Sequence, residues 1–162
     1  MTARPLPSLA VSTVPVDIAV FSKHRRPILD IEVENSLLYV TAESAAQVRR
    51  GFIRHDLLPD VPFFMLATPI QIFMWHGDAV PDAHPEYSAG AQQILESYTW
   101  NRAHREQSVR YGALEIVFFF WISDVASGVQ PLSADSELDR MLLESGLYEQ
   151  IKGGSADFDV QL

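Results

Sequence analysis

The stretch PVDIAVFSKHRRPILDIEVEN, residues 15–35, decides the fold of this chain of 162 residues. Two runs rich in β-branched and large apolar residues, 16–21 and 28–35, flank a polar break, KHRRP. This pattern predicts two strands joined by a tight turn. In the second run apolar residues alternate with acids, so one face of that strand is apolar and the other is acidic.

The pairing of the two strands brings acids together. If the turn is centred between His24 and Arg25, Asp17 lies directly opposite Glu32, and opposed residues share a face. Glu34 lies beside this pair. Carboxylates this close repel one another unless a positive group neutralises them, and Mg2+ readily binds carboxylate oxygens. A simpler interpretation stays open, in which the acids are the solvent face of a half-exposed strand.

The rest of the chain alternates between apolar runs and polar connections. We expect a loose arm over residues 1–14 and one domain over 15–162. Residues 36–41 either extend the second strand or form a loop, and 87–110 is ambiguous, with a helix as one option. Residues 111–127 are apolar enough for a strand or a helix, and their spacing favours a helix. We further expect a helix at 43–58, two buried strands within 61–77, a loop at 78–85, a helix at 135–152 capped by Ser133 or Asp135, and a short strand at 157–162.

The order of these features resembles a known family. Pro15-Val16-Asp17, a turn, and then Glu32-Val33-Glu34 is similar to the core motif of the PD-(D/E)XK nuclease superfamily. The helix AESAAQVRRGFIRHDLL, the strand pair PFFMLATPIQIFMWHGD and the segment LLESGLYEQIKGG continue the resemblance over most of the chain. The resemblance implies an α/β fold, with a mixed central sheet flanked by helices and a restriction-endonuclease-like core.

The resemblance also implies roles for individual residues. Asp17, Glu32 and the backbone carbonyl of Val33 would bind Mg2+ or Mn2+. Glu34 would accept a proton or bind a second metal, and Gln47 would orient water or phosphate. A set of arginines on the helix and at the hairpin tip is expected to contact nucleic acid, since arginine pairs with phosphate in a bidentate way: Arg25, Arg26, Arg49, Arg50 and Arg54. The alternative for these arginines is a solvated surface.

The chain departs from the family pattern at two places. Glu34 stands where most members carry a lysine, although some restriction endonucleases of the superfamily use glutamate there. Residues 1–14 contain prolines and no helical period, so the helix that usually precedes the first acid is not expected. Both departures favour a nuclease-like module that is catalytically inactive.

Composition narrows the possible partners. The net charge is −9, which argues against binding nucleic acid through overall charge. Residues 1–55 nevertheless carry seven Lys and Arg against five Asp and Glu, so the hairpin half is the less acidic one. Cysteine is absent and no apolar run is long enough to span a bilayer, so we expect a cytoplasmic protein with no membrane partner.

Three functions are compatible with the sequence. The first is Mg2+-dependent hydrolysis of DNA or RNA. The second is a catalytically inactive nuclease-like module that acts as an assembly or regulatory subunit, through a protein partner or as a homo-oligomer. The third is a general interaction domain whose likeness to the motif is accidental. His76, His84, Asp78 and Asp82 are interpreted as polar loop residues and not as a second metal site.

Overall fold

The computed structural model describes residues 13–36, 41–98 and 114–162. The chain is an α/β protein with one six-stranded mixed sheet, ordered β5-β4-β3-β2-β1-β6. Among the described strands β2 and β3 pair in parallel, and the other neighbours are antiparallel. The strands are β1 (Pro15–Phe21), β2 (Pro27–Val33), β3 (Phe63–Ala67), β4 (Gln71–His76), β5 (Tyr87–Gly90) and β6 (Ser155–Gln161).

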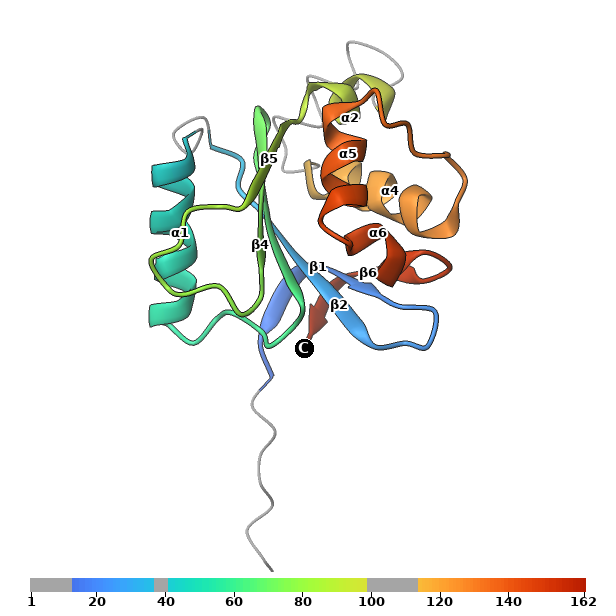
Figure 1. Ribbon diagram of the computed structural model, residues 1–162. Helices are drawn as coiled ribbons and strands as arrows, with labels where there is room; N and C mark the ends of the chain where they lie inside the picture. The colour runs from blue at the N-terminus through green and yellow to red at the C-terminus, as the bar shows by residue number, and fades with distance from the viewer. Residues whose placement is uncertain (1–12, 37–40, 99–113) are drawn as a thin grey trace, which may run out of the picture.

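Helices cover both faces of the sheet. α1 (Ala42–Arg54) lies alone on one side, and the remaining helices lie on the other, as Figure 1 shows. These are α2 (Gln92–Ser97), α4 (Leu114–Ser127), α5 (Glu137–Glu144) and α6 (Leu147–Ile151). No helix in the described ranges has the length and apolar character needed to cross a bilayer.

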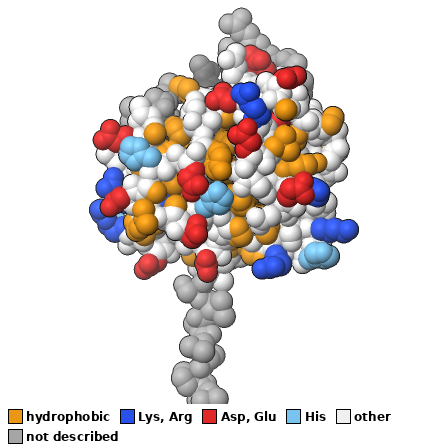
Figure 2. Space-filling model, in the orientation of Figure 1, with side chains coloured by type: hydrophobic (Ala, Val, Ile, Leu, Met, Phe, Trp, Pro, Cys, Tyr) orange, Lys and Arg blue, Asp and Glu red, His pale blue; other side chains and the backbone are white. Residues whose placement is uncertain are grey.

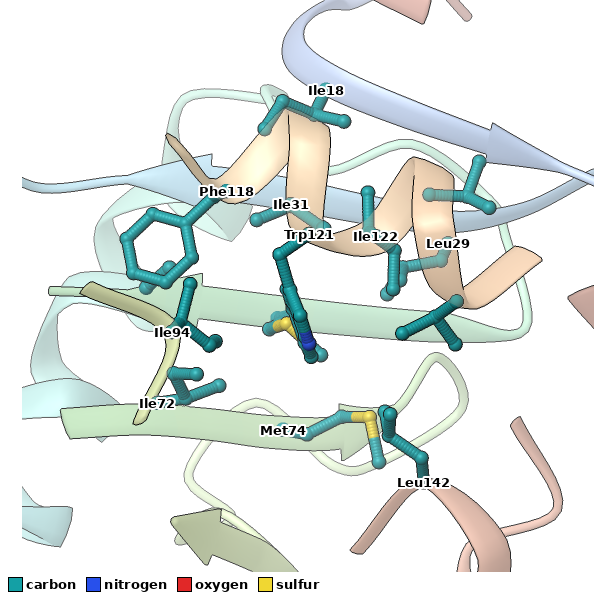
Figure 3. Packing of buried hydrophobic residues seen from close by; sticks show 14 of the residues in the cluster. Ile18, Leu29, Ile31, Ile72, Met74, Ile94, Phe118, Trp121, Ile122 and Leu142 are labelled. Atoms are coloured by element: carbon teal, nitrogen blue, oxygen red, sulfur yellow. The ribbon is translucent and has the colours of Figure 1, made fainter. Parts of the chain in front are cut away.

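The main core lies between the sheet and the helices opposite α1. Trp121 and Ile122 of α4 point toward Leu29 and Ile31 of β2 and toward Met74 of β4 (Figure 3). α4 is apolar around most of its circumference, which agrees with its place against this core. The predicted helix for this segment is confirmed over Leu114–Ser127.

A smaller apolar cluster lies under α1. Phe64, Leu66, Phe73 and Trp75 from β3 and β4 pack against Ala45, with Val48 and Phe52 at its edge. The side chain of Thr41 caps the first turn of α1 by accepting from the backbone N–H of Ser44. The predicted helix is therefore confirmed, although it ends at Arg54 and not near Leu58.

Other predictions need correction. The segment 135–152, expected as one helix, forms two helices, α5 and α6. Gly146 lies between them with φ 83°, a left-handed conformation that interrupts the helix. The cap of α5 is Ser136, which accepts from the backbone N–H of Asp139, and not Ser133 or Asp135. The strand pair within 61–77 and the final strand are confirmed, whereas β5 was not predicted. Residues 37–40 and 99–113, where an extended strand, a loop or a helix stayed open, lie outside the described residues.

Candidate functional site

The β1–β2 hairpin has the register predicted from the sequence. Ile18 pairs with Ile31, and Ala19 pairs with Asp30, so the same register places Asp17 opposite Glu32. The turn is closed by the backbone N–H of Ser22, which donates to the carbonyl of Arg26 at 2.8 Å. Arg25 occupies the left-handed region at φ 64°. The turn is thus centred on His24, not between His24 and Arg25 as predicted, and Phe21 pairs with Pro27. A shift of register between Val20 and Phe21 restores the predicted pairing over Ile18–Val20 and therefore brings the two acids opposite each other.

Two acids of β2 are buried rather than solvated. Asp30 is 0% exposed and Glu32 is 6% exposed. Both lie on the face that α1 covers, since their partners on β3 are Phe64 and Leu66. The solvent-face interpretation of these acids is therefore wrong for Asp30 and Glu32.

The buried carboxyl groups are short of hydrogen-bond donors. Both side-chain oxygens of Asp30 and the Oε1 atom of Glu32 have no partner among the described residues. Burial raises the pKa of Glu32, and the neighbouring carboxylates of Asp30 and Asp17 raise it further. Burial likewise raises the pKa of Asp30. Ionised carboxylates cannot donate to each other, so the cluster needs either a shared proton or a cation.

Asp17 and Glu34 complete this group. The backbone N–H of Val33 donates to Oδ2 of Asp17 at 2.8 Å, which holds the Asp17 carboxylate at the end of β2. Glu34 is half-buried, and burial together with the charge of Asp17 raises its pKa. Its backbone N–H donates to the carbonyl of Ala67, so Glu34 continues the line of β2 beside β3. The structure therefore brings Asp17, Glu32 and Glu34 to one end of the hairpin.

A pocket of about 320 Å³ opens beside Asp17 and Glu32. Asp159 and Gln161 of β6 form part of its wall, and the register of β1 with β6 places Asp159 opposite Asp17. Sequence reasoning missed Asp159, although the alternation in the final strand DFDVQL was a signal for it. The remaining wall is apolar and consists of Pro15, Val16, Phe52 and Leu57.

Gln47 and Arg49 do not face this pocket. Gln47 is exposed on α1 and is not part of the pocket wall. Arg49 is 1% exposed, and its guanidinium donates to the carbonyls of Val80 and Ala79 at 2.9 and 2.8 Å. The predicted phosphate contact of Arg49 is therefore corrected, because its side chain is held inside the fold.

The other arginines lie at two places on the surface. Arg25 donates to Ser155, lies 3.6 Å from the carboxylate of Asp157 and stacks over Phe21, so it ties the hairpin tip to β6. Arg50 pairs with Asp82 at 3.4 Å. Arg26 and Arg54 are exposed. On the face in Figure 2, basic side chains gather over α1 and over the hairpin tip, with acidic side chains between them.

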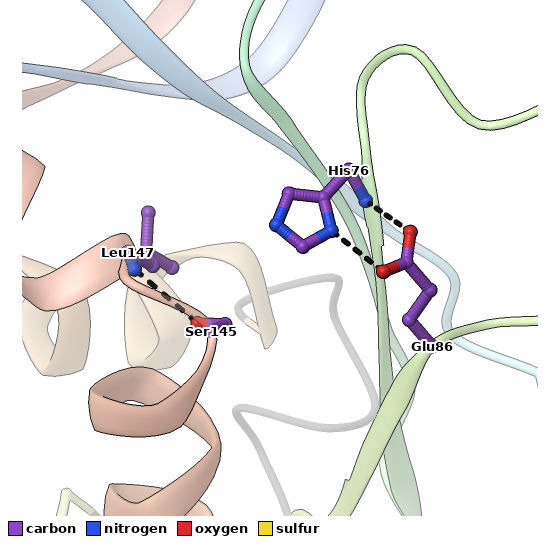
Figure 4. A network of polar contacts seen from close by, with 4 residues as sticks. All are labelled: His76, Glu86, Ser145 and Leu147. Carbon is purple, nitrogen blue, oxygen red and sulfur yellow. Dashed lines mark hydrogen bonds and ion pairs between the residues drawn. The ribbon is translucent and has the colours of Figure 1, made fainter.

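His76 is the last residue of β4 and not a loop residue as predicted, and its acidic partner is Glu86. Its Nδ1 atom lies 2.6 Å from Oε2 of Glu86, and its backbone N–H donates to Oε1 of the same residue (Figure 4). Burial raises the pKa of Glu86, but the hydrogen bonds from the side chain and the backbone N–H of His76 outweigh this effect, so the pKa is lowered. The contacts between His76 and Glu86 therefore connect the end of β4 with the residue directly before β5.

The described part of the chain contains no group of three His, Cys, Asp or Glu side chains arranged to hold a metal ion. A cation at Asp17 and Glu32 would therefore have two carboxylates and not three. No family model, curated protein or solved structure matches this chain.

Proposed function

We propose that this chain hydrolyses phosphodiester bonds of DNA or RNA with the help of Mg2+ or Mn2+, at a site in a restriction-endonuclease-like core. The observation that carries this proposal is the meeting of Asp17 and Glu32 across β1 and β2, beside an open pocket. Glu34 lies next to them, in the third position of the motif.

The donor set fits a hard cation. Oε1 of Glu32 is buried without a partner in the described residues, and the nearby acids disfavour its charged form unless a positive group is close. Mg2+ is commonly held by one or two carboxylates and completes its shell with water and substrate phosphate. Asp17, Glu32 and the carbonyl of Val33 would hold it. When bound, such an ion lowers the pKa of its water and offsets charge on the scissile phosphate.

The remaining roles belong to side chains around the pocket. Glu34 would accept a proton from the attacking water, and its raised pKa suits a base better than an ordinary glutamate would. Arg54 is exposed near the end of α1, between Phe52 and Leu57 of the pocket wall in the sequence, and would approach phosphates at the rim. Arg26 lies at the hairpin tip, at the opposite end of β2 from Glu32, and has no role at this pocket. Gln47 has no role in this proposal, because it is exposed and outside the pocket.

Calorimetric titration of Mg2+ and Mn2+ tests the proposal. The wild type is compared with Glu32→Gln, which keeps the shape of the side chain, and with Asp135→Asn, an exposed acid in the connection before α5. We expect binding in the wild type and in Asp135→Asn and its loss in Glu32→Gln. The wild type and Asp135→Asn should also cleave single- or double-stranded DNA or RNA, and Glu32→Gln should not. Failure of the wild type to bind either metal at millimolar concentration would reject the proposal.

A second candidate is a nuclease-like module that acts through protein contacts. Its support is an apolar group on α4 and β6. Ile116 is 46% exposed, Phe120 is 50% exposed and Phe158 is 37% exposed, and Phe119 stacks on Phe158 with ring centroids 3.9 Å apart. Apolar side chains grouped on a surface often mark a binding face. Sedimentation of the wild type and of Phe120→Ser would test this candidate, since a self-associating protein should become monomeric in the variant.

A further inference from the structure

The pocket beside Asp17 combines acids with apolar walls. Asp17, Glu32 and Asp159 supply three carboxyl groups from three adjacent strands. Phe52 and Leu57 supply an apolar side. Among the residues that the structure describes, no Lys, Arg or His lines the pocket. A ligand that fits it needs a positive group and an apolar stem.

Two of these acids have no positive partner in the described chain. Oε1 of Glu32 is buried, belongs to a side chain that lines the pocket and accepts no hydrogen bond there. Asp159 forms no ion pair with the described residues, whereas Asp157, two positions earlier on the same strand, is paired with Arg25. Within the described part of the chain, Arg25 therefore neutralises Asp157 of β6, and no basic side chain is paired with Asp159 at the pocket.

We propose that this pocket receives the side chain of an arginine from a basic segment of a partner protein. Arginine lays its methylene stem along apolar surface while its planar guanidinium pairs with carboxylates in a bidentate way. Phe52 and Leu57 would contact the stem, and Asp17 and Asp159 would accept from the guanidinium. When no cation is bound, a nucleic-acid phosphate placed in the same pocket would meet like charge.

The neighbouring strand favours a protein as the source of this arginine. β6 is the last strand of the sheet, so among the described strands its outer edge has no partner. Asp159 and Gln161 lie on this strand and line the pocket. An extended segment that adds to the edge of β6 would place every second side chain on the pocket face of the sheet. A free amine or a free guanidinium compound could enter the pocket but could not form backbone hydrogen bonds with the edge of β6.

The inference uses the same pocket as the proposed nuclease site, but it does not depend on metal binding or cleavage. The test therefore contains a chelator. Binding is measured by calorimetry with a capped pentapeptide that carries one central arginine between β-branched residues, and with the same peptide carrying citrulline, which has the same shape without the charge. Free arginine amide serves as the third probe.

We expect the arginine peptide to bind the wild type more tightly than either control probe, and more weakly as salt is added. Asp159→Asn should weaken binding by about tenfold or more through loss of the charge-assisted hydrogen bonds. Asn tolerates the φ of 43° at this position, so the variant keeps the fold. Asp135→Asn should bind as the wild type does.

Three results would overturn the inference. They are no binding of the arginine peptide, equal binding of the citrulline peptide, or an unchanged affinity in Asp159→Asn. Tighter binding of a single-stranded oligonucleotide that is lost in Asp159→Asn would also reject it, because the pocket would then serve a phosphate ligand. Absence of nuclease activity with intact arginine binding would reject the proposed cleavage and leave this inference standing.

Discussion

The guanidinium of Arg49 lies over the indole ring of Trp75, 5.7 Å from its centroid, and both side chains are buried. Two hydrogen bonds from the same guanidinium hold the backbone of Ala79 and Val80. Replacement of Arg49 by Met keeps the length of the side chain but leaves both carbonyls without their donor. We expect a loss of about 2–4 kcal/mol in the free energy of unfolding, measured by urea titration.

Arg50 is the matched control for that experiment. It is adjacent on α1, exposed, and paired only with Asp82 at the surface. Arg50→Met should change stability by less than about 1 kcal/mol, because exposed ion pairs contribute little. Equal losses in the two variants would contradict a structural role that is particular to Arg49.

The burial of Arg49 could have been predicted from the sequence, but its hydrogen-bond partners could not. Ala45, Val48 and Phe52 form one face of α1, and Arg49 falls on that face by helical spacing. This spacing predicts that the side chain of Arg49 points toward the sheet. Its partners could not be predicted, because the carbonyls of Ala79 and Val80 belong to a loop 30 and 31 residues away.

The hairpin was predictable because two local rules agree there. Alternation of period two assigned the faces of β2, and the assumed turn centre gave the observed pairing over Ile18–Val20, so the meeting of Asp17 and Glu32 followed. The shift of register between Val20 and Phe21 did not follow, because no local signal in the sequence marks it. The burial of Asp30 did not follow, since alternation separates two faces without saying whether both are covered. β5 was missed because its four residues, YSAG, carry almost no β-branched or alternating signal.

The burial of the Asp30 carboxyl group leads us to expect that the protein becomes less stable as pH rises. The pKa of Asp30 is raised in the folded state by burial, so the folded protein binds more protons than the unfolded chain at any pH between the two pKa values. Stability should therefore fall as pH rises from about 4, the ordinary pKa of aspartate, through the raised pKa of Asp30. Thermal unfolding measured from pH 5 to 9 would show this fall.

Asp30→Asn should remove the contribution of Asp30 to that fall. Asn resembles the neutral carboxyl in shape, so stability near pH 5 should match the wild type, and at pH 8 to 9 the variant should be more stable by about 1–3 kcal/mol. Asp135→Asn serves as the exposed control and should follow the wild-type curve. A variant that is equally destabilised at every pH would show instead that Asp30 acts through packing.

Two glycines offer opposite outcomes for the same substitution. A Cβ on Gly154 would collide with the backbone carbonyl of Phe21, where β6 begins beside the end of β1. A Cβ on Gly51, inside α1, meets nothing within 4 Å. We expect Gly154→Ala to cost about 1–3 kcal/mol and Gly51→Ala to add about 0.5–1 kcal/mol to the free energy of unfolding. Denaturation curves of both variants check the prediction, and a neutral Gly154→Ala would contradict the contact.

Replacement of Glu34 by Lys would place at this position the residue that most PD-(D/E)XK nucleases carry. Glu34 is half-buried beside Asp17, and burial together with the charge of Asp17 disfavours its ionised form. A lysine there would face Asp17 as an opposite charge, so the variant should keep the thermal stability of the wild type. The same replacement removes the carboxylate that is proposed to accept a proton from the attacking water, so we expect Mg2+-dependent cleavage to fall at least about tenfold. Thermal unfolding and a cleavage assay measure the two effects. Unchanged or faster cleavage by a stable Glu34→Lys variant would show that Glu34 is not the base.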